Sequence, residues 1–350
     1  MRYDMGGGVS SVSFRIAAGV AILGLVAGGC STGSSTDVET PTASARRLVA
    51  TVDVGGSLKD IAATDTAVWV TRSGYDNREV SEWDKVWRID PATNKIVATI
   101  QVGTRGLDTN GSWGHIAATK DAVWITGPRS VRRVDPATNK VVAKLEVGAY
   151  LSSFKDIAAT DTDVWVAGKS GYDDDAVYRI DVAKNKLAGV YTDVCTSDSA
   201  VGVAATDTAV WVTCGSVYGS KSPEVKRIDP VKNQDAALIK LDGTPEGISA
   251  TDTAVWVTSS GDDHRVWRIA PSTNTLVYSG DTESRPRGVA ATDRAGWVSS
   301  GSHVLELDVT GYAVTATVDV GREADALSAT ENAVWVNSDS DGIVSRIDPR

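Results

Sequence analysis

The sequence is short of several features that would point to particular functions. Its 350 residues include only three Cys, three His, two Met and two Phe. It also lacks an excess of basic charge, since 35 Lys and Arg stand against 45 Asp and Glu, for a formal net charge of −10. Because affinity for nucleic acid comes mainly from Lys and Arg that neutralise phosphates, we expect no nucleic-acid partner. Eleven Trp beside two Phe indicate one tryptophan that is copied many times.

No apolar run is long enough for a comfortable transmembrane helix. Residues 16–27 (IAAGVAILGLVA) have the length of the hydrophobic region of a signal peptide. They lead into Ala27–Cys30 (AGGC), which resembles a bacterial lipobox, in which the thiol is acylated and the chain is cleaved just before it; Ala27 is smaller than the residue usual there. We predict a lipoprotein signal peptide over residues 1–29 and lipid on Cys30. An ordinary secretory signal with an incidental Cys is the alternative.

The segment after the lipobox has almost no apolar side chain (residues 31–45, STGSSTDVETPTASA). It cannot bury enough surface to offset its ordering entropy, so residues 30–45 are predicted to be a flexible tether between lipid and domain. The protein is then expected outside the cytoplasm of a bacterial cell, anchored to the membrane surface. In that oxidising compartment the remaining cysteines, Cys195 and Cys214, are predicted to form a disulfide.

One phrase, IAATDTAVWVT (61–71), recurs seven times with its tryptophan at a mean spacing of about 44 residues. A second phrase of the type VWRIDPATNKIVATIQVG (86–103) follows the copies. Each unit is interpreted as four short strands, A to D, because Val, Ile, Thr and Trp dominate and breakers sit only at the turns. Four strands in about 44 residues are typical of a propeller blade. The repeated tryptophans are Trp69, Trp124, Trp165, Trp211, Trp256, Trp297 and Trp335.

The repeat also predicts how the ring closes. The last copy stops after its strand C, whereas residues 46–56 (RRLVATVDVGG) match a strand D and have no strands A to C before them. The N-terminal strand should therefore pair with the last blade and leave no exposed sheet edge. The predicted fold is all-β, a seven-bladed β-propeller of four-stranded antiparallel blades over residues 46–350.

The phrases VWRIDPATNKIVATIQVG and AVWVT resemble those of YVTN-repeat, YncE-like seven-bladed propellers, and they are similar to streptogramin (virginiamycin B) lyase-like propellers. The resemblance covers residues 46–350 and implies the propeller fold, which hosts unrelated activities. The lyase-like proteins use a His/Glu constellation with a divalent metal. No motif matches it residue by residue here, so we assign no catalytic residue, no metal ligand and no cofactor.

Variation between copies is confined to one face of the predicted ring. The A–B and C–D turns hardly change, whereas the B–C and D–A connections, such as residues 72–85 and 104–115, differ strongly. Such variation suggests a face diversified for contact, with neutral drift of exposed loops as the alternative. Trp83 and Trp113 lie in these connections, outside the repeat pattern, and are contact candidates.

The residues just before each strand A are predicted to reach the mouth of the central channel. They carry mixed charges with Trp113 and Phe154 nearby, and form the candidate ligand site; a merely polar, wet channel mouth is the alternative. With Trp83 and Trp113, the ligand-binding candidates are Lys59, Asp60, His115, Lys155, Asp156, Glu246, Arg287 and Asp325.

Charges that recur in nearly every blade are interpreted as architectural, as blade-to-blade contacts or turn caps. One position of the repeat holds Arg in six of the seven copies and Glu306 in the remaining one. Another position holds Asp in six copies. We therefore expect a monomeric, non-catalytic binding module for an envelope protein, a glycan or a small ligand. A lyase-like or other enzyme that uses the channel mouth around His115 with a divalent metal is the alternative.

Overall fold

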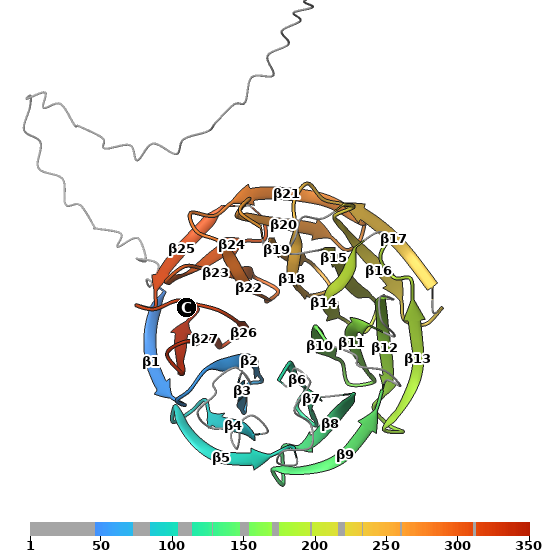
Figure 1. Cartoon of the computed structure of the whole chain (residues 1–350). Coiled ribbons are helices and arrows are strands. Elements are labelled where there is room, and N and C mark those ends of the chain that lie inside the picture. The colour runs from blue at the N-terminus through green and yellow to red at the C-terminus, as the bar shows by residue number, and fades with distance from the viewer. Residues whose placement is uncertain are drawn as a thin grey trace, which may run out of the picture. The chain divides into compact units, whose positions relative to one another are not determined.

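The computed structural model confirms the predicted seven-bladed β-propeller (Figure 1). It describes residues 46–72, 85–103, 114–127, 129–147, 154–169, 175–196, 198–215, 221–232, 234–259, 261–310 and 313–350. These residues form seven four-stranded antiparallel sheets. Among them, no helix is long and apolar enough to cross a membrane. Cys30, Trp83 and Trp113 lie outside the described residues.

The blades are numbered 1 to 7 by their inner strands, which surround the channel: β2 (Leu58–Ala63), β6 (Ile116–Ala118), β10 (Asp156–Ala159), β14 (Ser199–Ala205), β18 (Pro245–Ala250), β22 (Pro286–Ala291) and β26 (Leu327–Thr330). The second strands, in the same order, are β3 (Val68–Arg72), β7 (Val123–Gly127), β11 (Asp163–Lys169), β15 (Val210–Gly215), β19 (Val255–Ser259), β23 (Ala295–Ser300) and β27 (Ala333–Ser338).

The third strands are β4 (Lys85–Asp90), β8 (Ser130–Asp135), β12 (Asp175–Asp181), β16 (Glu224–Asp229), β20 (Arg265–Ala270), β24 (His303–Asp308) and β28 (Ile343–Asp348). The outer strands are β5 (Lys95–Gln101), β9 (Lys140–Glu146), β13 (Lys186–Thr192), β17 (Gln234–Lys240), β21 (Thr275–Asp281), β25 (Val314–Asp319) and, for blade 7, β1 (Arg47–Asp53).

The turn between the third and outer strands explains its repeated Asp and Asn. In blade 1, Asp90 accepts hydrogen bonds from the Ala92 amide (2.8 Å) and the Thr93 hydroxyl (2.9 Å). Asn94 then takes a positive φ of 55°, a conformation that Asn tolerates better than most residues. The repeated Asp is therefore a turn cap, as the sequence predicts.

The core lies between blades. Each of the seven repeated tryptophans is at most 1% exposed. Trp69 of blade 1, for example, packs in one cluster with Ile116 and Val123 of blade 2. The second strands are buried on both faces, because each blade is covered by two neighbours.

The repeated arginine joins five of the seven blades to the next. Arg88 lies over the Trp69 ring of its own blade, with Cζ 5.1 Å from the ring centroid. It donates hydrogen bonds to the Pro136 carbonyl (2.7 Å) and to Asn139 Oδ1 (2.9 Å) of blade 2. Four further arginines lie over the Trp ring of their own blade and donate a hydrogen bond to a backbone carbonyl of the next blade: Arg133, Arg179, Arg227 and Arg346.

The ring closes between strands from opposite ends of the propeller sequence. β1 pairs antiparallel with β28, and Arg47 lies opposite Asp348 while Asp53 lies opposite Ile343. This pairing confirms the closure predicted from the incomplete last copy. It joins two distant segments, so no hairpin turn connects the third and outer strands of blade 7.

Glu306 breaks the arginine pattern at the blade that precedes this closure. The arginine of blade 6 would need acceptors in the hairpin turn of blade 7, which does not exist. The Glu306 carboxylate instead forms an ion pair with Arg46, which comes just before β1. Arg46 Nε lies 2.8 Å from Glu306 Oε2, and Arg46 Nη2 lies 3.0 Å from Glu306 Oε1. The inverted charge therefore pairs with the segment that closes the ring.

The predicted disulfide is also present. Cys195 follows β13 of blade 3 and Cys214 lies near the end of β15 of blade 4, and their Cα atoms are 5.5 Å apart. The bond links two adjacent blades on the side of the ring that carries the variable connections.

Arg46→Ala is expected to lower the free energy of unfolding by about 2 kcal/mol, and Glu306→Ala by less. The Glu306 side chain is 8% exposed and loses its compensating charge, whereas Arg46 is 28% exposed and can be rehydrated. A double-mutant cycle by urea unfolding should show that the two losses are coupled. The control is Arg294 with Glu331, an exposed ion pair between the same two blades, for which we expect almost no coupling. Additive losses at Arg46 and Glu306 would contradict the assignment.

Candidate functional site

A cavity of about 380 Å³ opens at one mouth of the channel. The inner strands of several blades contribute to it, so residues far apart in the sequence meet there. Of the predicted ligand candidates, it is lined by Lys59, Asp60, His115, Lys155, Asp156, Glu246 and Arg287. Asp325 is not among the lining residues but contacts Arg287.

Equivalent positions around this mouth are not equivalent in chemistry. The residue just before the apolar part of the inner strand is Asp60, His115 and Asp156 in blades 1 to 3. In blades 4 to 7 it is Gly202, Gly247, Gly288 and Ala326. Polar side chains at this level therefore occupy one arc of the ring.

Close packing explains the glycines on the other arc. A Cβ on Gly202 would lie 2.4 Å from the Glu246 carbonyl oxygen of the next blade, and one on Gly288 would lie 2.3 Å from that of Asp325. Real side chains do not tolerate such distances. In blades 4 and 6 the backbone of the next blade therefore leaves no room for a side chain at this position.

Backbone amides hold both carboxylates in place. Asp60 accepts from the Ile61 amide (2.8 Å) and, across the blade boundary, from the Ile116 amide (3.0 Å). Asp156 repeats the pattern with the amides of Ile157 and Val203, both at 2.8 Å. Each Asp therefore also ties its blade to the next one.

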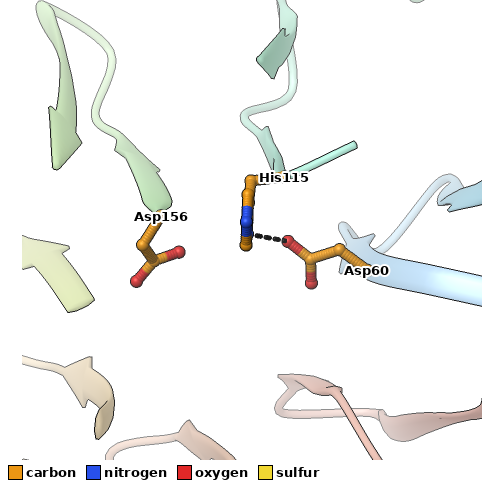
Figure 2. Close-up of side chains that lie close together, drawn as sticks. All are labelled: Asp60, His115 and Asp156. Carbon is orange, nitrogen blue, oxygen red and sulfur yellow. Dashed lines mark ion pairs between the residues drawn. The ribbon is translucent and has the colours of Figure 1, made fainter. Parts of the chain in front are cut away.

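His115 lies between the two aspartates (Figure 2). Its Nδ1 is 3.7 Å from Asp60 Oδ2, and its side chain is 16% exposed. One ligand atom from each of Asp60, His115 and Asp156 lies within 4.8 Å of the other two. We call these three residues the Asp–His–Asp cluster.

Burial changes the protonation of two members of the cluster. It lowers the pKa of His115 below its usual value, and the nearby charges of Lys59 and Lys155 lower it further, although Asp60 opposes them. It also raises the pKa of Asp156 to about 7, and the negative charge of Asp60 acts in the same direction. The cluster therefore presents a neutral imidazole with an available lone pair at neutral pH.

Two exposed lysines flank the cluster. Lys59 and Lys155 are exposed, and neither makes an ion pair within the part of the chain that the structure describes. The other charged residues at the mouth are compensated. Glu246 lies 3.7 Å from Arg285, and Arg287 contacts Glu323 and, at 3.0 Å, Asp325.

The structure differs from the sequence-based expectations in two details. Several candidates lie inside the inner strands and not before them: Lys59 and Asp60 in β2, where the register shifts between Leu58 and Asp60, Asp156 in β10, Glu246 in β18 and Arg287 in β22. Phe154 does not line the mouth, contrary to the prediction. It is 2% exposed and packs edge-on against Tyr178, with ring centroids 5.9 Å apart, in the core between blades 2 and 3.

Sequence reasoning named the three cluster residues but not their association. An alignment of the seven inner strands carries the signal, since Asp, His and Asp occupy in three consecutive blades a position that is Gly or Ala in the others. The other two histidines lie elsewhere: His264 just before β20, and His303 at the start of β24.

Comparison with known proteins supports the fold and goes no further. No family model and no curated protein matches the chain. A solved structure titled Kuenenia stuttgartiensis hydrazine synthase is similar, with a TM-score of 0.64 and 13% sequence identity, over 85% of this chain and 96% of that one. At this identity the similarity shows the propeller fold alone.

The raised pKa of Asp156 predicts a pH dependence of stability. The folded state binds this proton more tightly than the unfolded chain, whose carboxyl has its ordinary pKa near 3.8. The free energy of unfolding should therefore fall as the pH rises from about 4 to about 7. Asp156→Asn cannot ionise, so the stability of the native protein relative to this variant should decrease over that range. Asp161→Asn, an exposed site in the same blade, is the control in urea unfolding series. A difference between native protein and Asp156→Asn that stays constant with pH would contradict the shift.

Proposed function

We propose that this chain is a lipid-anchored protein of the bacterial envelope whose propeller binds a small acidic solute at the channel mouth without transforming it. The observation that carries the proposal is the pair of exposed ammonium groups, Lys59 and Lys155, which line the cavity beside the Asp–His–Asp cluster and make no ion pair within the described residues. An exposed ammonium group at the rim of a cavity is suited to receive an anionic group from a ligand.

The size and polarity of the site favour a small solute over a polymer. A cavity of about 380 Å³ falls within the usual range for small-molecule sites, roughly 300–1,000 Å³. Carboxylates, an imidazole and ammonium groups converge there, so a ligand with two or three carboxylates and some hydroxyl groups fits its chemistry. The variable connections on one face remain a second contact surface, for an envelope protein or a glycan.

The placement in the envelope rests on the sequence. Residues 16–30 support a lipoprotein signal with Cys30 as the acylated residue, and residues 31–45 support a tether. The disulfide is in keeping with an oxidising compartment. The repeat phrases support a relationship with YVTN-repeat, YncE-like propellers, and we expect the protein to be a monomer.

A lyase-like enzyme is a second candidate, favoured by one observation. An imidazole held between two carboxylates can exchange protons with a substrate. It ranks second because the lyase-like propellers use His with Glu, whereas Glu246 belongs to blade 5 and His115 to blade 2.

Isothermal titration with citrate and succinate tests the proposed ligand class, and glucose serves as the uncharged probe. We expect the two acids to bind and glucose not to bind. Lys59→Ala combined with Lys155→Ala should weaken acid binding at least tenfold, because the charge-assisted contacts are lost. Lys120→Ala, on the opposite face of the ring, is the matched control. Equal binding of glucose, or unchanged acid binding in the double variant, would refute the ligand class.

Cys30→Ser tests the anchor. The substitution removes the thiol that would carry lipid, so the protein should no longer incorporate labelled palmitate in growing cells. Cys195→Ser is the control and should leave the labelling unchanged. A Cys30→Ser protein that still incorporates the label would argue against acylation at this residue.

A further inference from the structure

We propose that Asp60, His115 and Asp156 bind a divalent transition-metal ion at the channel mouth. One ligand atom from each lies within 4.8 Å of the other two, and Figure 2 shows the imidazole between the two carboxylates. The inference extends the proposed function, because a bound cation gives an acidic solute a direct point of attachment.

The donor set indicates the class of metal. One imidazole nitrogen and two carboxylate oxygens suit Zn²⁺ and Mn²⁺, since imidazole favours the first-row transition metals and carboxylates accept them as well. Ca²⁺ needs six to eight oxygen ligands, more than this cluster offers. Three protein ligands leave positions open on the metal for water or for a carboxylate of the solute.

The carboxylates are fixed as metal ligands usually are. Backbone amides bind both oxygens of Asp60 and both oxygens of Asp156, so the side chains are oriented before a metal arrives. Each oxygen keeps a further lone pair for coordination. Ligand atoms at tetrahedral positions on a cation with bonds of about 2.0–2.2 Å are about 3.3–3.6 Å apart, so binding requires the three side chains to draw together by about 1 Å, most simply through rotation of the His115 ring.

The surrounding charges link the metal to the solute. Asp60 and Asp156 face each other across the imidazole, and a cation between them relieves their repulsion. Lys59 and Lys155 oppose a bare cation but attract an anion that sits on it. Metal and acid are therefore expected to strengthen each other's binding by the same factor.

As an alternative to metal binding, Asp60 and Asp156 could serve only to tie their blades to the next ones. A variant of His115 distinguishes a metal site from such a structural role. Within the described residues, the His115 side chain makes one hydrogen-bonding or ion-pair contact, from its Nδ1 to Oδ2 of Asp60. His115→Ala should therefore leave the fold intact while it removes a metal ligand. Asp60→Ala and Asp156→Ala remove a ligand and a tie together, so they need a check of thermal unfolding.

The test uses the full chain purified from membranes in detergent and dialysed against EDTA, with no organic acid present. Titration calorimetry with Zn²⁺, and loss of the aqueous Mn²⁺ EPR signal, should each show one bound equivalent. His115→Ala should weaken binding at least tenfold, whereas Asp121→Ala, an exposed carboxylate on the opposite face, should not change it. No saturable binding, or full affinity in a folded His115→Ala protein, would overturn the metal site.

Two further titrations separate this inference from the proposed function. Citrate would chelate the metal, so succinate is used, once in EDTA and once with Zn²⁺ present. If Zn²⁺ binds in a His115-dependent way but succinate does not bind, the metal site is supported and only the acidic solute is refuted. Succinate binding in EDTA without any Zn²⁺ binding refutes only the metal site.

Discussion

Five of the seven blades of this propeller are joined to the next by an arginine that lies over its own tryptophan and donates a hydrogen bond to a carbonyl of the neighbouring blade. In blade 1 this arginine is Arg88, which connects Trp69 with Pro136 and Asn139. Because the same interface must recur around a closed ring, its residues can hardly vary from blade to blade. The repetition in the sequence is a consequence of that constraint, and residues that recur need no functional explanation.

Departures from the repeat are therefore the informative positions, and they fall into two groups. Glu306 departs where the ring closes without a hairpin, and Arg46 supplies the charge that it needs. Asp60, His115 and Asp156 depart at the channel mouth, where the remaining blades have Gly or Ala. The first departure serves the closure of the ring, whereas the second brings together polar groups that the fold does not require in every blade.

The sequence was sufficient for the architecture. The tryptophan spacing predicted seven blades, the unmatched segment at residues 46–56 predicted the closure, and the two cysteines predicted the disulfide; the structure confirms all three. These features are repetitive or local, so pattern alone reveals them. The lipid anchor and the tether stay predictions.

The candidate site was less accessible to sequence reasoning. Seven of the residues named from the sequence line the cavity, whereas Asp325 does not and Phe154 packs in the core against Tyr178. Which charges are compensated also depends on contacts between blades. Arg287 forms an ion pair with Asp325 of the following blade, whereas Lys59 and Lys155 form no ion pair within the described residues. Such pairings need coordinates, since no local pattern determines them.

The central claim is that the three polar departures at the mouth form one cation site. Anomalous diffraction at the zinc absorption edge, from crystals of the full chain grown with Zn²⁺, tests it most directly. The account predicts an anomalous peak between the side chains of Asp60, His115 and Asp156. A map without a peak there, or with Zn²⁺ held only by other residues, would contradict it.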